Sequence, residues 1–282
     1  MLGKLIKYDM KSISRTLIPL WILAPVISLL FSISIRGLVG TAEYAVQNTL
    51  ENQALIQGSA IITGITTLVF FGVMIAILVM TVLFIIQRFW NGLLKEEGYL
   101  MFTLPVETWE LVVSKGICAT VVSCVSILVG VVSCVVMFMG AISGFDELWN
   151  GIGQLIGYAV KADGVMIWSC NVVLFVLLMI VGTAESVYRV YAAMALGQLF
   201  EGHRVVGACV SYIGIGIAWS LISGIFTIIV SLALPDTAYY LTEDFGVFGL
   251  LYMLVLLLIT LFQIVIWHLM TVHILSRHLN LE

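Results

Sequence analysis

Six long runs of apolar residues, none of which contains a charged side chain, constrain the fold of this 282-residue chain more than any other feature. A membrane hydrocarbon core about 30 Å thick requires about 20 apolar residues of helix to cross it, and each run meets that length. Apolar residues make up 62% of the chain and charged residues 10%, whereas soluble domains contain roughly 45–50% and about 25%. The sequence therefore predicts an all-α membrane protein of one domain, residues 1–282, with six transmembrane helices. The predicted spans cover residues 17–35, 61–86, 117–142, 165–184, 205–234 and 246–269.

The distribution of lysine and arginine along the chain predicts its orientation. If the N-terminus lies in the cytosol, all but two of the twelve basic residues fall on the cytosolic side, and Arg36 and Lys161 fall outside. Cytosolic loops of membrane proteins carry the excess of lysine and arginine, so both termini are predicted to be cytosolic. The first apolar run has no A-x-A cleavage site and is longer than the apolar part of a signal peptide, so we expect it to remain as a span.

The first sixteen residues predict an amphipathic helix that lies in the membrane interface on the cytosolic side. Apolar side chains recur every three or four positions from Leu2 to Leu17, and four basic side chains recur likewise. Such a helix places its apolar side in the headgroup boundary, and each basic residue attracts anionic lipid by about 1 kcal/mol. The helix either anchors the topology alone or also has a mechanical role. Its basic residues are Lys4, Lys7, Lys11 and Arg15.

A polar and charged segment, residues 88–115, separates the second and third spans and is predicted to face the cytosol. Paired glutamates in this loop are followed by a glycine and then by a run of four apolar residues. Apolar side chains this dense on a water-facing loop indicate that they pack against something. We interpret this part of the loop as a docking surface. Its residues are Glu96, Glu97, Gly98, Tyr99, Leu100, Met101, Phe102, Thr103, Leu104 and Pro105.

A second segment, residues 185–204, is too polar to span a membrane and too apolar to be a free linker. Glu185 and Arg189 form an ExxxR pattern, which is half of the EExxxR motif of membrane-embedded prenyl-protein peptidases. Ala184 stands where that motif has its other glutamate, so we favour an ion pair between residues four apart on one helix. The candidate residues of this cytosolic segment are Glu185, Arg189, Gln198, His203 and Arg204.

Two further patterns concern helix surfaces. Gly216, Ser220 and Gly224 recur every four residues in the fifth span, and small residues at this spacing allow two helices to approach closely. The partner helix belongs either to this chain or to a second copy. Outside the membrane, residues 145–159 carry apolar side chains at helical spacing and predict an amphipathic helix on the outer leaflet.

The sequence contains no pattern that predicts catalysis, a bound metal or a nucleic-acid partner. It has no G-x-x-x-x-G-K-[ST] phosphate-binding loop, so ATP hydrolysis is not expected on this chain. The predicted spans lack the Asp, Glu, Lys and Arg residues that ion-coupled transporters use. The five cysteines have no CxxC spacing, and the net charge of −4 argues against nucleic acid. We expect Asn171 and Gln263 to form hydrogen bonds between helices, and His268, near the inner end of the last span, to be an interfacial side chain.

The chain resembles the permease subunits of type-2 ATP-binding-cassette exporters, in the small six-span form found in Gram-positive bacteria. Three segments carry this resemblance: MLGKLIKYDMK at the N-terminus, EEGYLMFTLPV followed by Ser114 and Lys115 in the first loop, and YAAMALGQLFEGHRVVG over residues 191–207. They cover the first four spans and the start of the fifth. The last third of the chain is similar only in topology.

The resemblance implies a non-catalytic subunit in the bacterial plasma membrane. Two permease chains, identical or different, would form the export pathway, and two copies of a separate ATPase subunit that binds ATP and Mg would dock below them. The family's coupling helix would correspond here to residues 96–105. The charge-free spans suit an apolar or amphipathic cargo, such as a peptide antibiotic or a lipid-like molecule. Two alternatives stay open: a membrane scaffold or sensor that binds a cytosolic partner without transport and, ranked third, an intramembrane hydrolase that uses Glu185.

Overall fold

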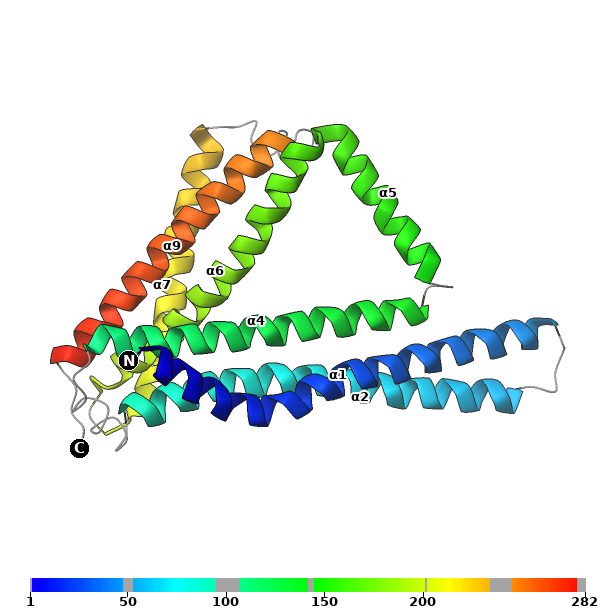
Figure 1. Ribbon diagram of the computed structural model, residues 1–282, viewed down its shortest axis with the longest axis horizontal. Helices are drawn as coiled ribbons and strands as arrows, with labels where there is room; N and C mark the ends of the chain where they lie inside the picture. The colour runs from blue at the N-terminus through cyan, green and yellow to red at the C-terminus, as the bar shows by residue number, and fades with distance from the viewer. Residues whose placement is uncertain are drawn as a thin grey trace. The chain divides into compact units, whose positions relative to one another are not determined.

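The structure, a computed structural model, describes residues 2–47, 53–94, 107–141, 145–200, 202–233 and 245–277. Within these ranges all regular secondary structure is helical (Figure 1). The elements in chain order are α1 (Leu2–Gln47), α2 (Gln53–Phe89), a short π-helix (Trp90–Leu94), α4 (Thr108–Ala141), α5 (Phe145–Asp163), α6 (Val165–Gly197), α7 (Arg204–Ala233) and α9 (Phe245–Arg277).

Six of the helices in the described residues are long and apolar enough to cross a membrane. The predicted all-helical class and the predicted number of membrane helices are confirmed to that extent. Each predicted apolar run falls in a different helix, although Ile142 and Leu234, the last residues of two runs, lie outside the described residues. The side of the membrane on which the termini lie stays a prediction. The candidate spans are Arg15–Ala42, Ile56–Leu94, Thr108–Met139, Gly164–Gly197, Arg204–Ile229 and Gly246–Arg277.

Helix α1 contains 46 residues and runs without a break through Pro19 and Pro25. The sequence predicted a separate helix over residues 1–16 and a span ending at Ile35, whereas the structure joins the two and continues the helix to Gln47. At about 1.5 Å of rise per residue, α1 is about 69 Å long, roughly twice the thickness of a hydrocarbon core. Part of α1 must therefore extend beyond the apolar layer of the membrane.

The basic residues near the start of α1 are exposed where the structure describes them. Lys7, Lys11 and Arg15 all have exposed side chains. The side chain of Lys4 lies outside what the structure describes. Exposure of the three basic side chains is compatible with contact to anionic headgroups, and the placement of this part of α1 in the interface stays a prediction.

The chain divides into two compact units, which we describe separately. The first unit comprises Met1–Asp9, Ile85–Val121 and Gly157–Glu282, and the second comprises Met10–Phe84 and Val122–Ile156. In the first unit, α6 packs against both α7 and α9 (Figure 1). The end of α2 and the start of α4 also belong to this unit. The prediction of a single domain stays a prediction.

Three polar side chains connect α1, α2 and α4 within the second unit. The Trp21 indole in α1 donates a hydrogen bond to the Ser126 hydroxyl in α4 over 3.0 Å. The Ser126 hydroxyl lies 2.9 Å from the hydroxyl of Thr81 in α2. Ser126 and Thr81 are buried, and hydrogen bonds between membrane helices contribute about 0.6 to 2 kcal/mol each. These bonds hold α1, α2 and α4 in one register.

Arg36, which the sequence places outside the membrane, binds the end of α4. Its Nη2 donates to the carbonyl of Met139 over 2.9 Å. The last carbonyls of a helix have no partner within the helix, and a positive charge is favourable near that end. The contact therefore links α1 to the last turns of α4.

Replacing Ser126 by alanine removes the acceptor for Trp21 but leaves Thr81 bonded to the carbonyl of Ile77, at 2.7 Å. We expect Ser126→Ala to lower the free energy of unfolding, measured by SDS titration with circular dichroism, by about 1 kcal/mol. Ser223→Ala is the control, because the Ser223 hydroxyl bonds to the Ser220 carbonyl of its own helix. Equal losses in the two variants would contradict the assigned role of Ser126.

Candidate functional site

The predicted docking surface lies outside the described residues, and the structure describes the chain on both sides of it. Before the loop, α2 continues into the π-helix, which ends at Leu94. After the loop, the carbonyl of Glu107 accepts hydrogen bonds from the backbone N–H groups of Glu110 and Leu111 and so begins α4. The Trp109 indole also donates to the Glu107 carboxylate. The prediction for the docking surface therefore stays a prediction, for Glu96, Glu97, Gly98, Tyr99, Leu100, Met101, Phe102, Thr103, Leu104 and Pro105.

Both ends of this loop are buried in one hydrophobic core, that of the first unit. Phe89 and Leu93 on the first side and Leu111 and Val112 on the second are almost completely shielded from solvent. The same core includes side chains of α6, α7 and α9. The loop thus begins and ends on a packed base to which the end of α2, the start of α4 and three further helices contribute.

Tyr191 of α6 lies at the centre of this core and is fully buried. Its ring stacks on that of Phe89, with centroids 4.1 Å apart and planes 20° apart. Its hydroxyl donates to the backbone carbonyl of Lys115 over 3.2 Å. Because Phe89 ends α2 and Lys115 lies in the second turn of α4, one side chain fixes both flanks of the loop to α6.

A second tyrosine of α6 fills the space beside Gly116. The ring of Tyr188 meets that of Tyr191 edge-on at 6.1 Å and that of His268 at 5.6 Å. A Cβ on Gly116 would lie 2.5 Å from the Tyr188 hydroxyl, so only glycine allows α4 to approach α6 this closely. His268, flagged from the sequence as a polar residue of the last span, thus takes part in aromatic packing between α6 and α9.

Lys115 is buried, although the sequence placed it on a cytosolic loop. A Cβ on Gly92 would lie 3.3 Å from its Nζ, so the ammonium group lies beside the backbone of the π-helix. Burying a charge is costly unless other groups compensate it. Residue 115 therefore belongs to the buried base of the loop, which the sequence did not indicate.

Glu185 and Arg189 form the predicted ion pair between residues four apart, and the pair also connects three spans. Arg189 Nη2 lies 3.1 Å from Glu185 Oε2. The indole of Trp267 in α9 donates to Glu185 Oε1 over 3.1 Å, and the Arg189 guanidinium lies 6.0 Å from the centroid of the Tyr212 ring in α7. Glu185 itself is buried. Each carboxylate oxygen accepts a hydrogen bond from the protein, an arrangement that suits a structural charge.

Asn171 makes a further link between α6 and α9, as predicted for the polar residues of the spans. Its side-chain Nδ2 donates to the carbonyl of Gly246 over 3.0 Å, and the side chain is buried. This bond lies near the start of both helices, whereas the Glu185 bond to Trp267 lies in the second half of each. Two polar contacts therefore fix the register of α6 against α9.

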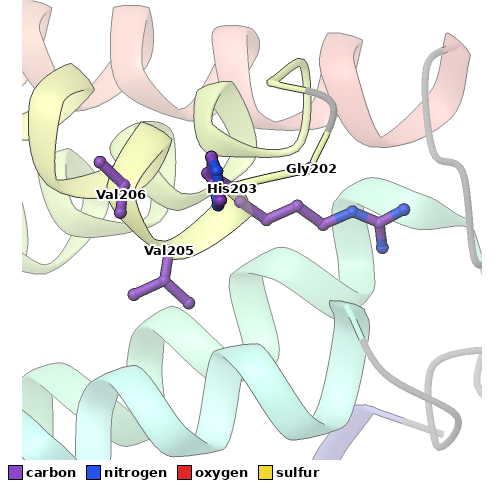
Figure 2. Close-up of a pocket in the computed structure, with 5 residues that line it drawn as sticks. Gly202, His203, Val205 and Val206 are labelled. Carbon is purple, nitrogen blue, oxygen red and sulfur yellow. The ribbon is translucent and has the colours of Figure 1, made fainter.

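The remaining predicted residues of the second segment lie at the corner between α6 and α7. Helix α6 continues through Glu185 and ends at Gly197, so the connection is short. Gly202 has a φ of 90°, which glycine adopts without strain. Around it lies an open pocket, on which Figure 2 shows the side chains of His203, Val205 and Val206. The predicted residues at this corner are Gln198, His203 and Arg204.

Two glycines make this corner tight. A Cβ on Gly197 would lie 2.6 Å from the backbone nitrogen of Ala208, and a Cβ on Gly207 would lie 2.7 Å from the ring of Phe200. The start of α7 therefore packs backbone to backbone on the end of α6. Close approach of this kind between membrane helices depends on small residues.

The predicted small-residue stripe of the fifth span has a different environment. No side chain or backbone of another element lies within 4 Å of a Cβ built on Gly216 or Gly224, and Ser220 is exposed. Within the described part of the chain, the helix that this stripe would pack against is therefore not present. The stripe stays a prediction.

Substitution of Gly197 tests the tight corner. An alanine there would force its Cβ against the backbone of Ala208, and overpacking of this kind costs about 1–3 kcal/mol of stability. Gly182→Ala on the same helix is the matched control, since its Cβ would meet open space and alanine is favoured over glycine in a helix by about 1 kcal/mol. We expect melting temperatures in detergent to fall for Gly197→Ala and to stay or rise for Gly182→Ala.

A second pair of variants tests the buried carboxylate. Trp267→Phe leaves Oε1 of the buried Glu185 without its indole donor, and we expect a loss of about 1–3 kcal/mol in the free energy of unfolding. Trp109→Phe is the control, because its indole also donates to a carboxylate, that of Glu107, but on an exposed surface. If SDS titrations gave the same change in the free energy of unfolding for both variants, burial of the Glu185 bond would have no effect on stability.

Comparisons of the chain with models of protein families, with curated proteins and with solved structures found no significant match.

Proposed function

We propose that this chain is the membrane-spanning permease subunit of a type-2 ATP-binding-cassette exporter. The observation that carries the proposal is the anchoring of the loop between α2 and α4. Both of its ends are buried in the hydrophobic core of the first unit, which also contains parts of α6, α7 and α9. A loop that receives force from a cytosolic partner needs such a base, because a loosely held loop would move without moving the helices.

The contacts of the first unit suggest how a displacement of the loop would reach the spans. A shift of the end of α2 acts on Tyr191 through its stacking on Phe89. A shift of α4 acts on the same side chain through the Lys115 carbonyl. Helix α6 then passes the movement to α9 through the bond from Trp267 to Glu185. In this proposal the chain transmits the movement of the loop to the spans, while the partner ATPase binds ATP and Mg and hydrolyses the ATP.

The positions of the charged side chains favour an apolar or amphipathic cargo. Of the ionisable residues within the described spans, Arg88 and Lys115 lie towards helix ends, whereas Glu185 and Arg189 lie in the second half of α6 and pair with each other. Charges inside a transmembrane pathway usually mark sites for ions or polar substrates. A peptide antibiotic or a lipid-like molecule, exported across a bacterial plasma membrane by two such chains, fits the apolar middle of the spans.

Loss of docking after changes in the loop is the direct test. The partner to use is an ATPase with the G-x-x-x-x-G-K-[ST] motif encoded beside this chain. We expect Tyr99→Ala, Phe102→Ala and Glu97→Lys to reduce its retention on the purified permease, because they remove apolar contact area or reverse a charge. Tyr158→Ala is the control, since this exposed tyrosine lies on α5.

Retention that is unchanged in all three loop variants would refute the docking role. Vesicles that contain the chain and its partner separate a permease from a scaffold or sensor. ATP-dependent movement of an amphipathic cargo is expected of the permease, and binding of the partner without such movement would favour the scaffold.

A further inference from the structure

Helix α5 has two sides of opposite polarity, and both are exposed. Trp149, Ile152 and Ile156 share one side of the helix, because residues three and four positions apart lie on the same face. Their exposed fractions are 65%, 40% and 40%. The opposite side carries Asn150 and Gln154, which are also exposed. A helix with this division, exposed on both sides, is typical of the boundary between water and lipid.

A single residue connects α5 to the next candidate span. The N–H of Gly164 donates to the Val160 carbonyl over 2.9 Å and closes the last turn of α5, while its carbonyl accepts from the N–H of Trp168 over 3.1 Å and begins α6. Gly164 has a φ of 78°. Helix α5 therefore ends where a span begins. The first residues of that span, Val165 and Met166, are 67% and 80% exposed, as expected of side chains that contact lipid.

Charge distinguishes α5 from the basic start of α1. The sequence of α5 contains three acidic residues, Asp146, Glu147 and Asp163, and one lysine, Lys161. Anionic headgroups attract basic segments and repel an acidic helix by the same Coulomb interaction. Contact between α5 and lipid must therefore depend on the apolar side chains rather than on headgroup charge.

We propose that α5 docks on the headgroup boundary of zwitterionic or uncharged lipid through Trp149, Ile152 and Ile156, and that its acidic residues discriminate against anionic lipid. The amphipathic ring of Trp149 suits this boundary, where tryptophan is enriched. Along the chain, α5 ends one residue before α6, a candidate span that starts with exposed apolar side chains. The inference concerns only the connection between α4 and α6 and does not depend on the proposed export function.

Single cysteines on the two sides of α5 test the proposal in the full-length protein, reconstituted in phosphatidylcholine vesicles. Ile152→Cys and Ile156→Cys probe the apolar side, and Asn150→Cys and Gln154→Cys are the matched controls. The unmodified chain, whose five cysteines lie within candidate spans, gives the background. We expect a membrane-impermeant maleimide to react several times faster at positions 150 and 154 than at 152 and 156.

A bimane label at each position identifies what covers the apolar side. Brominated phosphatidylcholine is expected to quench the label more strongly at 152 and 156 than at 150 and 154. Replacing half of the lipid with phosphatidylglycerol should raise maleimide reactivity at position 152, and high salt should reverse that rise because it screens the repulsion.

Three results would overturn the proposal. Equal maleimide reactivity on both sides of the helix would mean that the apolar side faces water. Protection at 152 and 156 without quenching by brominated lipid would mean that protein, such as a second copy of the chain, covers it. Equal or lower maleimide reactivity at position 152 in vesicles that contain phosphatidylglycerol would show that α5 does not discriminate against anionic lipid.

Discussion

Burial of the Tyr191 side chain is the interaction on which the first unit depends. A buried hydroxyl without a partner costs about 1–3 kcal/mol, and this one finds its partner in the backbone carbonyl of Lys115. The same ring stacks on Phe89. Since the two contacts come from α4 and from the end of α2, neither segment can shift against α6 without either losing the bond or opening the stack. Tyr191 therefore fixes the two segments that flank the loop between α2 and α4.

The Glu185 contacts add specificity to this packing. Apolar side chains in a membrane can slide past one another at little cost, because lipid is as apolar as they are. A buried carboxylate is costly unless its donors are in place, so α6 has one favourable register against Trp267 of α9. Arg189 brings α7 into the same arrangement through Tyr212. Polar contacts thus select one arrangement of the helices among several that would have nearly equal free energies if only apolar side chains were in contact.

The number and the type of the membrane helices could be predicted from the sequence, because the length of an apolar run is a local property. The ends of the helices could not be predicted. Helix α1 continues to Gln47 and α6 to Gly197, through residues that are too polar to be recognised in the sequence as membrane-spanning. The ion pair of Glu185 and Arg189 was predictable from its spacing. Its connection to Trp267, 82 residues away, was not, because no local pattern encodes a contact between distant helices.

The candidate site shows the same division between local and distant information. Acidic and apolar residues in the first loop suggest a docking surface from sequence alone, whereas the core beneath that loop combines side chains from α2, α4, α6, α7 and α9. Lys115 illustrates the difference. A lysine beside a loop suggests exposure, yet Gly92 and Gly116 let neighbouring elements approach so closely that the residue is enclosed.

The π-helix at Trp90–Leu94 sets the angular position, around the helix axis, of the side chains that follow the end of α2. A π-turn contains one residue more than an α-turn, and each residue of an α-helix advances the side chains by about 100° around the axis. Leu93 and Leu94, in this turn, are both buried in the core. An insertion or deletion of one residue in this turn would shift the side chains that follow by about 100° around the axis, so the length of the turn is fixed more strictly than its composition.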